Sequence, residues 1–182
     1  MPDRVANIIV LCEDQEQQIL VRRYLNRLGR RDARFASVVG KNGCGSQYVR
    51  KQFPKQVAVC RGTLGKRTGC LLIVMTDADN LTVQAREQTL QNELKSSNFT
   101  AVTNEEPIII LIPKWQVETW IKCLLGQLMD ENDMNSDRPP VRPDEIKTAA
   151  ERLYDWTRPN ALVGTTCVPS LRSALPRWLR IG

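Results

Sequence analysis

The chain has 182 residues, of which 42% are hydrophobic and 25% are charged, a composition typical of a globular protein large enough for a real core. It contains no histidine, which excludes catalysis by a histidine base and metal binding through imidazole. No run approaches the roughly 18 apolar residues of a membrane helix, and the first residues lack a signal-peptide pattern, so we expect a cytoplasmic protein. Its six cysteines form no Cys-x-x-Cys pair, which argues against structural zinc and predicts reduced thiols.

The formal net charge of +6 is unevenly divided along the chain. Residues 1–67 carry 14 Lys/Arg and 5 Asp/Glu, a balance of +9, whereas residues 68–182 carry 12 and 15, a balance of −3. Such an excess of positive charge favours a polyanionic partner, and nucleic acid, DNA in particular, is the partner we expect. A solvated helix face is the alternative interpretation. The candidate nucleic-acid-binding residues are Arg22, Arg23, Lys41, Arg50 and Lys51.

The first predicted elements alternate between strand and helix. An apolar strand over residues 6–12 is followed by an amphipathic helix over residues 15–28 and a second strand over residues 33–39. A loop rich in Gly, Asn and Cys, residues 40–46, then opens a helix through Ser46. Because this loop does not have the order of a phosphate-binding Walker A motif, a simple turn is the preferred interpretation.

The same alternation continues in the rest of the chain. The predicted elements are a strand over residues 71–75, a helix over 81–96 capped by Asn80, a strand over 108–112, a helix over 116–125, and two C-terminal helices beginning near residues 143 and 170. This order predicts an α/β fold with a mainly parallel sheet of about four strands and helices on both faces. Residues 1–125 would form the core domain, 126–142 an acidic, Pro-rich loop, and 143–182 a helical extension packed on the core.

Acidic residues follow two of the predicted strands at the point where each strand ends. Asp77 and Asp79 come just after the most apolar run of the chain, and Glu13 follows the first strand directly. Because ligands bind beyond the carboxyl ends of parallel strands, neighbouring strands would bring the three carboxylates to one site. If the strand persists through Asp79, both aspartates project the same way and converge on Mg²⁺ or Mn²⁺. The alternative is that each is an ordinary turn or helix-capping residue.

These residues resemble the signature of the Toprim domain, the metal-binding fold of topoisomerases, bacterial primases and OLD-family nucleases. The resemblance spans roughly residues 7–147 and is greatest to small stand-alone Toprim-related proteins and to OLD-type nuclease domains. In those proteins a further glutamate opens a helix after the next strand, and Glu118 stands in that place. A lysine at the start of a late helix is also expected, and Lys147 resembles it.

The sequence departs from the Toprim pattern just after the first glutamate. Family members commonly have glycine at the next position and an acid four residues after the glutamate, whereas this chain has Asp14 and Gln17. Asp14 or Glu16 is therefore the candidate for a ligand of a second metal ion.

The resemblance implies a metal-dependent nuclease. Mg²⁺ or Mn²⁺ would be held by Asp77, Asp79 and Glu118; Glu13 would be a ligand or the general base, and Lys147 would stabilise charge on the scissile phosphate. We expect a DNA endonuclease that hydrolyses phosphodiesters without a covalent intermediate, acting in bacterial defence or DNA repair. By analogy to relatives that join the two parts, its ATPase partner would be a separate subunit, and oligomerisation stays open.

Two alternatives remain at the level of sequence. One is a non-catalytic Toprim subunit that binds nucleic acid or an ATPase partner. The other is a receiver-like phosphoacceptor module, because Glu13-Asp14, Asp77 and Lys114 can be laid on the receiver plan. A receiver has no need of Asp79 or Glu118, so these two residues discriminate between the two families.

Overall fold

The predicted alternation of strands and helices produces one parallel sheet. The computed structural model describes residues 7–38, 45–62, 66–67, 69–133 and 140–182. Four strands, β1 (Asn7–Cys12), β2 (Arg34–Phe35), β3 (Cys70–Met75) and β4 (Ile108–Leu111), are arranged in the order β2-β1-β3-β4. Every neighbouring pair is parallel, which confirms the α/β fold class. The second strand is much shorter than the predicted span of residues 33–39.

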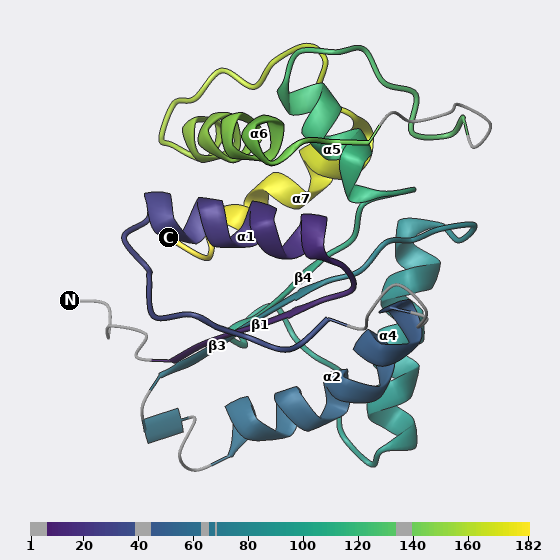
Figure 1. Ribbon diagram of the computed structural model, residues 1–182. Coiled ribbons are helices and arrows are strands. Elements are labelled where there is room, and N and C mark those ends of the chain that lie inside the picture. The colour runs from purple at the N-terminus through teal and green to yellow at the C-terminus, as the bar shows by residue number, and fades with distance from the viewer. Residues whose placement is uncertain (1–6, 39–44, 63–65, 68, 134–139) are drawn as a thin grey trace.

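Helices cover both faces of this sheet, as the sequence predicts (Figure 1). The helices are α1 (Gln15–Arg27), α2 (Gly45–Arg61), α4 (Val83–Ser96), α5 (Val117–Leu124), α6 (Pro143–Trp156) and α7 (Pro169–Leu179). Helices α2 and α4 lie on one face, and α1, α5, α6 and α7 lie on the other. None of the helices in the described ranges is long and apolar enough to cross a membrane.

Helix α4 begins later than the sequence suggests. Thr82, and not Asn80, is its N-cap, because the Thr82 hydroxyl accepts a hydrogen bond from the Ala85 N–H at 3.0 Å. Threonine is a good N-cap residue, since its oxygen satisfies one of the free N–H groups of the first turn. Asp79 and Asn80 therefore form a turn that precedes the helix, closed by a 2.9 Å hydrogen bond from the Leu81 N–H to the Ala78 carbonyl.

Two apolar clusters form the core, one on each face of the sheet. On the α1 face, Val10, Ile73 and Leu111 pack with residues of α1, α5, α6 and α7. On the opposite face, Leu72 and Val74 pack with α2 and α4. All six residues of β3 are buried because helices cover both sides of this central strand, which explains its continuous apolar run.

The C-terminal helices are integral to the core on the α1 face. Trp178 of α7 is completely buried, and its carbonyl accepts a hydrogen bond from the Tyr24 hydroxyl of α1 at 3.1 Å. Lys122 of α5, itself nearly buried, forms a 3.0 Å ion pair with Glu145 of α6. Residues 143–182 thus share one apolar cluster with α1 and α5.

The prediction that the thiols are reduced is wrong for one pair. Cys60, near the end of α2, and Cys70, the first residue of β3, are joined in a disulfide with their Cα atoms 5.3 Å apart. No pattern in the sequence indicates this pair, because the contact depends on how α2 returns to the sheet. Cys12, Cys123 and Cys167 are buried free thiols.

Candidate functional site

The strand order places Glu13 and Asp77 on either side of the point where the sheet topology reverses. Strand β1 has β2 on one side and β3 on the other, and Cys12 pairs with Met75 at the carboxyl ends of β1 and β3. In open α/β sheets this point is where ligands bind. The Asp77 N–H donates to Glu13 Oε2 at 3.0 Å, and the Thr76 hydroxyl donates to the same oxygen at 2.8 Å. The two predicted acidic strand ends therefore meet directly.

Gln17 joins the same two acids from helix α1. Its side chain is fully buried; Nε2 donates to Asp77 Oδ1 at 2.9 Å, and Oε1 accepts from the Glu13 N–H at 3.0 Å. In the sequence, Gln17 was only a departure from an expected acid. Only the spacing of Gln17 could have indicated this role. In a helix, side chains four positions apart lie on the same face, so Gln17 lies on the side of α1 that faces Glu13 at the end of the strand.

Asp14 serves as the N-cap of α1. Its Oδ1 accepts a hydrogen bond from the Gln17 N–H at 2.8 Å, which is the ordinary capping interpretation of an acid after a strand. Burial raises the pKa of Asp14 to about 7, and the negative charges of Glu118, Glu16 and Glu13 also raise it. Asp14 is thus both a structural cap and a member of the acidic cluster.

The strand does not persist through Asp79, so the condition under which Asp77 and Asp79 would project the same way is not met. Strand β3 ends at Met75, and Asp79 has a left-handed φ of 51°, which ends the alternation of side chains. Asp77 is engaged by Gln17 of α1 on one face of the sheet. Asp79 instead pairs with Arg86 of α4 on the other face, with Arg86 Nη2 2.7 Å from Asp79 Oδ2.

The carboxylates nevertheless form one electrostatic cluster, which we call the acidic edge. Its members are Glu13, Asp14, Asp77, Asp79 and Glu118. Burial raises the pKa of Asp77 well above its usual range, and the other four members raise it further. Burial also raises the pKa of Glu13, although its hydrogen bonds from Thr76 and Asp77 oppose the increase. Strongly perturbed acids gathered at a sheet edge are typical of functional sites.

The donor chemistry of the acidic edge fits a hard divalent cation, because every candidate ligand is a carboxylate oxygen. Within the described ranges, however, no three acidic or cysteine side chains form a ready metal-binding group. Protein donors hold one oxygen on each of three acids, Glu13, Asp77 and Asp79, and the second oxygen of each takes no part in these bonds.

The first residue of α2 lies against Glu13. A Cβ atom added to Gly45 would be 2.5 Å from Glu13 Cγ and 2.6 Å from the Glu13 carbonyl oxygen. Only glycine permits this approach without displacing Glu13. The N-terminus of a long helix thus lies beside the acidic edge, where its partial positive charge favours anions.

Lys147 lies elsewhere in the molecule. It is exposed on α6, which packs against α1 and α5, and no contact among the described residues joins it to the acidic edge. Lys114, the lysine of the receiver plan, donates through Nζ to the Leu81 carbonyl at 3.0 Å. Glu16 lies in the first turn of α1 beside Asp14, and Glu118 in the first turn of α5.

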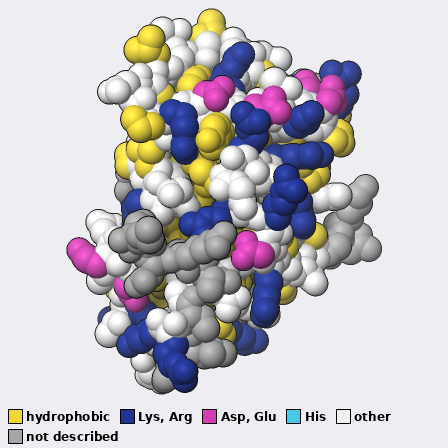
Figure 2. All heavy atoms as spheres, turned by 90° about the vertical axis from the view of Figure 1, so that its left-hand side faces the viewer, with side chains coloured by type: hydrophobic (Ala, Val, Ile, Leu, Met, Phe, Trp, Pro, Cys, Tyr) yellow, Lys and Arg dark blue, Asp and Glu magenta, His cyan; other side chains and the backbone are white. Residues whose placement is uncertain are grey.

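The candidate nucleic-acid-binding residues differ in how available they are. Arg22, Arg23 and Lys51 are exposed, although the Arg22 guanidinium carbon lies 3.9 Å from the centre of the Phe35 ring. Arg50 forms an ion pair with Glu93 at 3.4 Å, and Lys41 lies outside the described residues. Figure 2 shows many Lys and Arg side chains on the face at the amino ends of the strands, so positive charge is not confined to the surroundings of Glu13.

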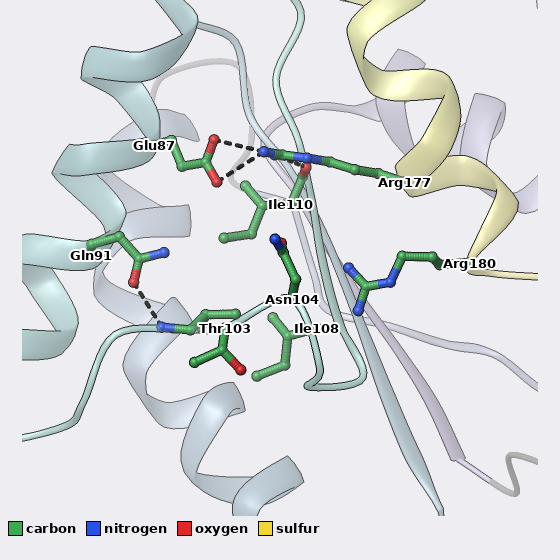
Figure 3. A pocket seen from close by; sticks show the side chains of 9 residues that line it. Glu87, Gln91, Thr103, Asn104, Ile108, Ile110, Arg177 and Arg180 are labelled. Carbon is green, nitrogen blue, oxygen red and sulfur yellow. Dashed lines mark hydrogen bonds and ion pairs between the residues drawn. The ribbon is translucent and has the colours of Figure 1, made fainter.

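A separate hollow lies along the outer edge of β4 (Figure 3). Arg177 of α7 reaches across the strand to Glu87 of α4, and Asn104 and Arg180 lie beside the same hollow. Its volume of about 30 Å³ accommodates only a few water molecules. This hollow is too small for a substrate.

Comparison with known proteins adds no relative. No protein-family model matches the chain, and neither a curated protein nor a solved structure matches it. The candidate site therefore depends on its own geometry and chemistry.

Proposed function

We propose that this protein is a Mg²⁺- or Mn²⁺-dependent endonuclease of the Toprim type that hydrolyses phosphodiesters, DNA being the favoured substrate. The observation that carries the proposal is the hydrogen bond that the Asp77 backbone N–H donates to the Glu13 carboxylate, which brings the two acidic strand ends together at the reversal point of the sheet. A buried acid and a partly buried acid beside each other, both with raised pKa values, favour a bound cation, which relieves their mutual repulsion.

Each residue of the acidic edge has a role in this proposal. Asp77, Asp79 and Glu118 would hold the cation, and Asp14 or Glu16 would contribute to a second ion. The cation would activate water and neutralise the charge that develops on the scissile phosphate. Glu13 would be a ligand or the general base; its raised pKa suits the second role, because a base works best when its pKa is near the operating pH.

Several groups would position these acids. Gln17 and Thr76 hold Asp77 and Glu13 in register through hydrogen bonds of 2.8 to 3.0 Å. The exposed Arg22, Arg23 and Lys51 are the described candidates for contacts to the nucleic-acid backbone. Lys147 would approach the scissile phosphate only if substrate or a partner reached α6.

The cellular setting is part of the same proposal. We infer a cytoplasmic effector in bacterial defence or DNA repair that works with an ATPase on a separate chain. The support is that the acidic strand ends resemble those of proteins in which Toprim and ATPase parts occur together. This support is an analogy to a protein family and does not come from the geometry of the site.

A plasmid-nicking assay tests the proposal. Purified protein is incubated with supercoiled DNA at low salt in Mg²⁺, Mn²⁺ or EDTA, beside Glu13→Gln and Asp77→Asn. Asp155→Asn, which removes an exposed carboxylate of α6, is the matched control. We expect metal-dependent nicking in the wild type and the control, and at least 100-fold slower nicking in the two site variants, the loss typical of a missing catalytic base.

The other outcomes identify the alternatives. DNA binding without nicking under any metal would indicate a non-catalytic Toprim subunit. Stable phosphorylation of Asp77 by a small phosphodonor, unaffected by Asp79→Asn and Glu118→Gln, would indicate the receiver-like module.

A further inference from the structure

Arg86 of α4 is a buried charge that its hydrogen bonds satisfy only in part. The residue is 6% exposed, and its Nη2 donates to Asp79 Oδ2 at 2.7 Å and to the Ala78 carbonyl at 3.4 Å. Its Nε is buried and has no hydrogen-bond partner among the described residues. A buried polar group without a partner is rare and calls for an explanation, particularly on a charged side chain.

The ion pair with Asp79 does not explain the burial of Arg86 by itself. The Asp79 side chain is 46% exposed, so water screens its charge, whereas only 7% of the Arg86 side chain is exposed. One screened carboxylate repays only part of the cost of removing a guanidinium from water. Further negative charge close to Arg86 would repay more of that cost.

The acidic edge supplies that negative charge. Arg86 also acts on Glu13, whose pKa it lowers against the larger effect of burial, while Asp79 raises the pKa of the same group. Arg86 thus opposes the repulsion between Glu13 and Asp79. Arg86 therefore both acts on Glu13 and contacts Asp79, a member of the acidic edge.

We propose that Arg86 is a positioning residue that acts as the internal counter-cation of the acidic edge, holding Asp79 and offsetting the repulsion among the carboxylates when no external cation is bound. A divalent cation that uses Asp79 must then compete with Arg86, so Arg86 sets the cation concentration at which the site fills. This second consequence rests on the proposed metal-dependent function, whereas the counter-cation role does not.

Chemical unfolding in EDTA at pH 8 tests the counter-cation role without metal or substrate. Arg86→Gln should lower the denaturation midpoint, and adding Glu13→Gln to it should restore part of the loss, because the second change removes a charge that Arg86 had offset. Glu13→Gln keeps a side-chain oxygen that accepts the hydrogen bonds from the Thr76 hydroxyl and the Asp77 N–H. Adding Asp155→Asn instead should restore nothing. Equal midpoints for the two double variants would overturn the proposal, as would Arg86→Lys being no more stable than Arg86→Gln.

If Arg86→Gln alone does not fold, the double variants still decide the question. Recovery of soluble, folded protein on adding Glu13→Gln, but not on adding Asp155→Asn, supports the counter-cation role. Failure of both double variants to fold contradicts it, because the residue would then be required for packing alone.

Calorimetric titration with Mn²⁺ alone tests the competition. We expect Arg86→Gln to bind Mn²⁺ roughly tenfold more tightly than the wild type, since one positive charge beside the site is lost. Arg86→Lys should stay near the wild type. Unchanged or weaker binding in Arg86→Gln would overturn the competition. If even the wild type binds no Mn²⁺, the proposed metal-dependent function fails, and the unfolding experiment still decides the role of Arg86.

Discussion

Asp77 is a buried acid that depends on donors from other elements. It is 6% exposed, and Gln17 is the side chain that donates to its Oδ1. A buried carboxylate that loses its donor retains the cost of desolvation without the compensating bond. The stability of the protein and the form of the candidate site are therefore linked through one glutamine.

Replacing Gln17 with methionine tests this link. Gln17→Met keeps the size of the side chain but removes the bonds to Asp77 and to the Glu13 N–H. We expect the free energy of unfolding in urea to fall by roughly 1–3 kcal/mol. Gln15→Met, at an exposed position of the same helix, is the control and should change little. An equal effect of the two substitutions would contradict the bridging role of Gln17.

The raised pKa values of the acidic edge predict how stability depends on pH. The pKa of Asp14 is about 7 in the folded protein, mainly through burial, against an ordinary value of 3.8. The folded state therefore binds more protons than the unfolded state between these values, and the free energy of unfolding should fall as pH rises from about 4 through about 7. Raised values for Glu13 and Asp77 act in the same direction.

Urea unfolding in EDTA across this pH range measures the effect. The free energy of unfolding of Asp14→Asn should fall less steeply with rising pH than that of the wild type. The reason is that asparagine caps a helix as well as aspartate does but does not titrate. Identical slopes for the two proteins would show that Asp14 is not the group responsible.

At the residue scale, the sequence predicted the acids but not the groups that hold them. Glu13 was predictable because it directly follows an apolar strand, and Asp77 because one residue separates it from another apolar strand. Gln17 and Arg86 were missed because a polar residue in an amphipathic helix is usually exposed, and only the packing of α1 and α4 against the strand ends makes these two buried.

At the scale of elements, the contact between α2 and the acidic edge depends on a glycine. Ordinarily a Gly→Ala change within a helix increases stability by roughly 0.5–1 kcal/mol. At Gly45 the added Cβ would meet Glu13 at 2.5 Å, so we expect Gly45→Ala to lower the thermal unfolding temperature instead. Gln47→Ala, on an exposed position of the same helix, should show no such loss. A more stable Gly45→Ala protein would contradict this close approach.

The outer edge of β4 is protected by an arginine from α7. Arg177 Nη1 donates to the Ile110 carbonyl at 2.7 Å, and Nη2 forms bonds of 3.0 and 2.9 Å with both oxygens of Glu87 (Figure 3). Unprotected edge strands pair with other chains, and proteins blunt them with charged side chains. Arg177 therefore covers an outward-facing carbonyl that would otherwise be free to pair.

Removing this cover should promote self-association. We expect Arg177→Ala to show more dimer and larger species than the wild type in sedimentation velocity, increasingly so at higher protein concentration. Arg172→Ala, at an exposed position of the same helix, is the matched control. Monodisperse behaviour of Arg177→Ala, equal to that of the control, would exclude a protective role for Arg177.

The elements were predictable where local signals were strong. Strands β3 and β4 read as unbroken apolar runs because helices cover both faces. Strand β2 was overestimated because it is an edge strand in which only Arg34 and Phe35 pair with β1, and its length is set by that pairing. The position of Asp79 was missed because its left-handed φ interrupts the period of two.

At the scale of the whole molecule, the parallel order β2-β1-β3-β4 is what turns two separate acidic strand ends into one site. The alternation of elements predicted the parallel sheet, and the rule for ligand sites in such sheets predicted the edge. The distribution of charge was less predictable, because a charge balance counted along the sequence does not show which faces of the fold carry the charge. Figure 2 shows basic side chains at the end of the molecule opposite to the acidic edge.

The proposed function depends on the binding of a divalent cation at the acidic edge, which electron paramagnetic resonance of Mn²⁺ detects without substrate. Free Mn²⁺ is measured as it is titrated with wild-type protein, Asp77→Asn and the Asp155→Asn control. We predict that the wild type and the control bind Mn²⁺ equally and that Asp77→Asn loses the bound ion. Absence of bound Mn²⁺ in the wild type, or unchanged binding in Asp77→Asn, would contradict cation binding at the acidic edge.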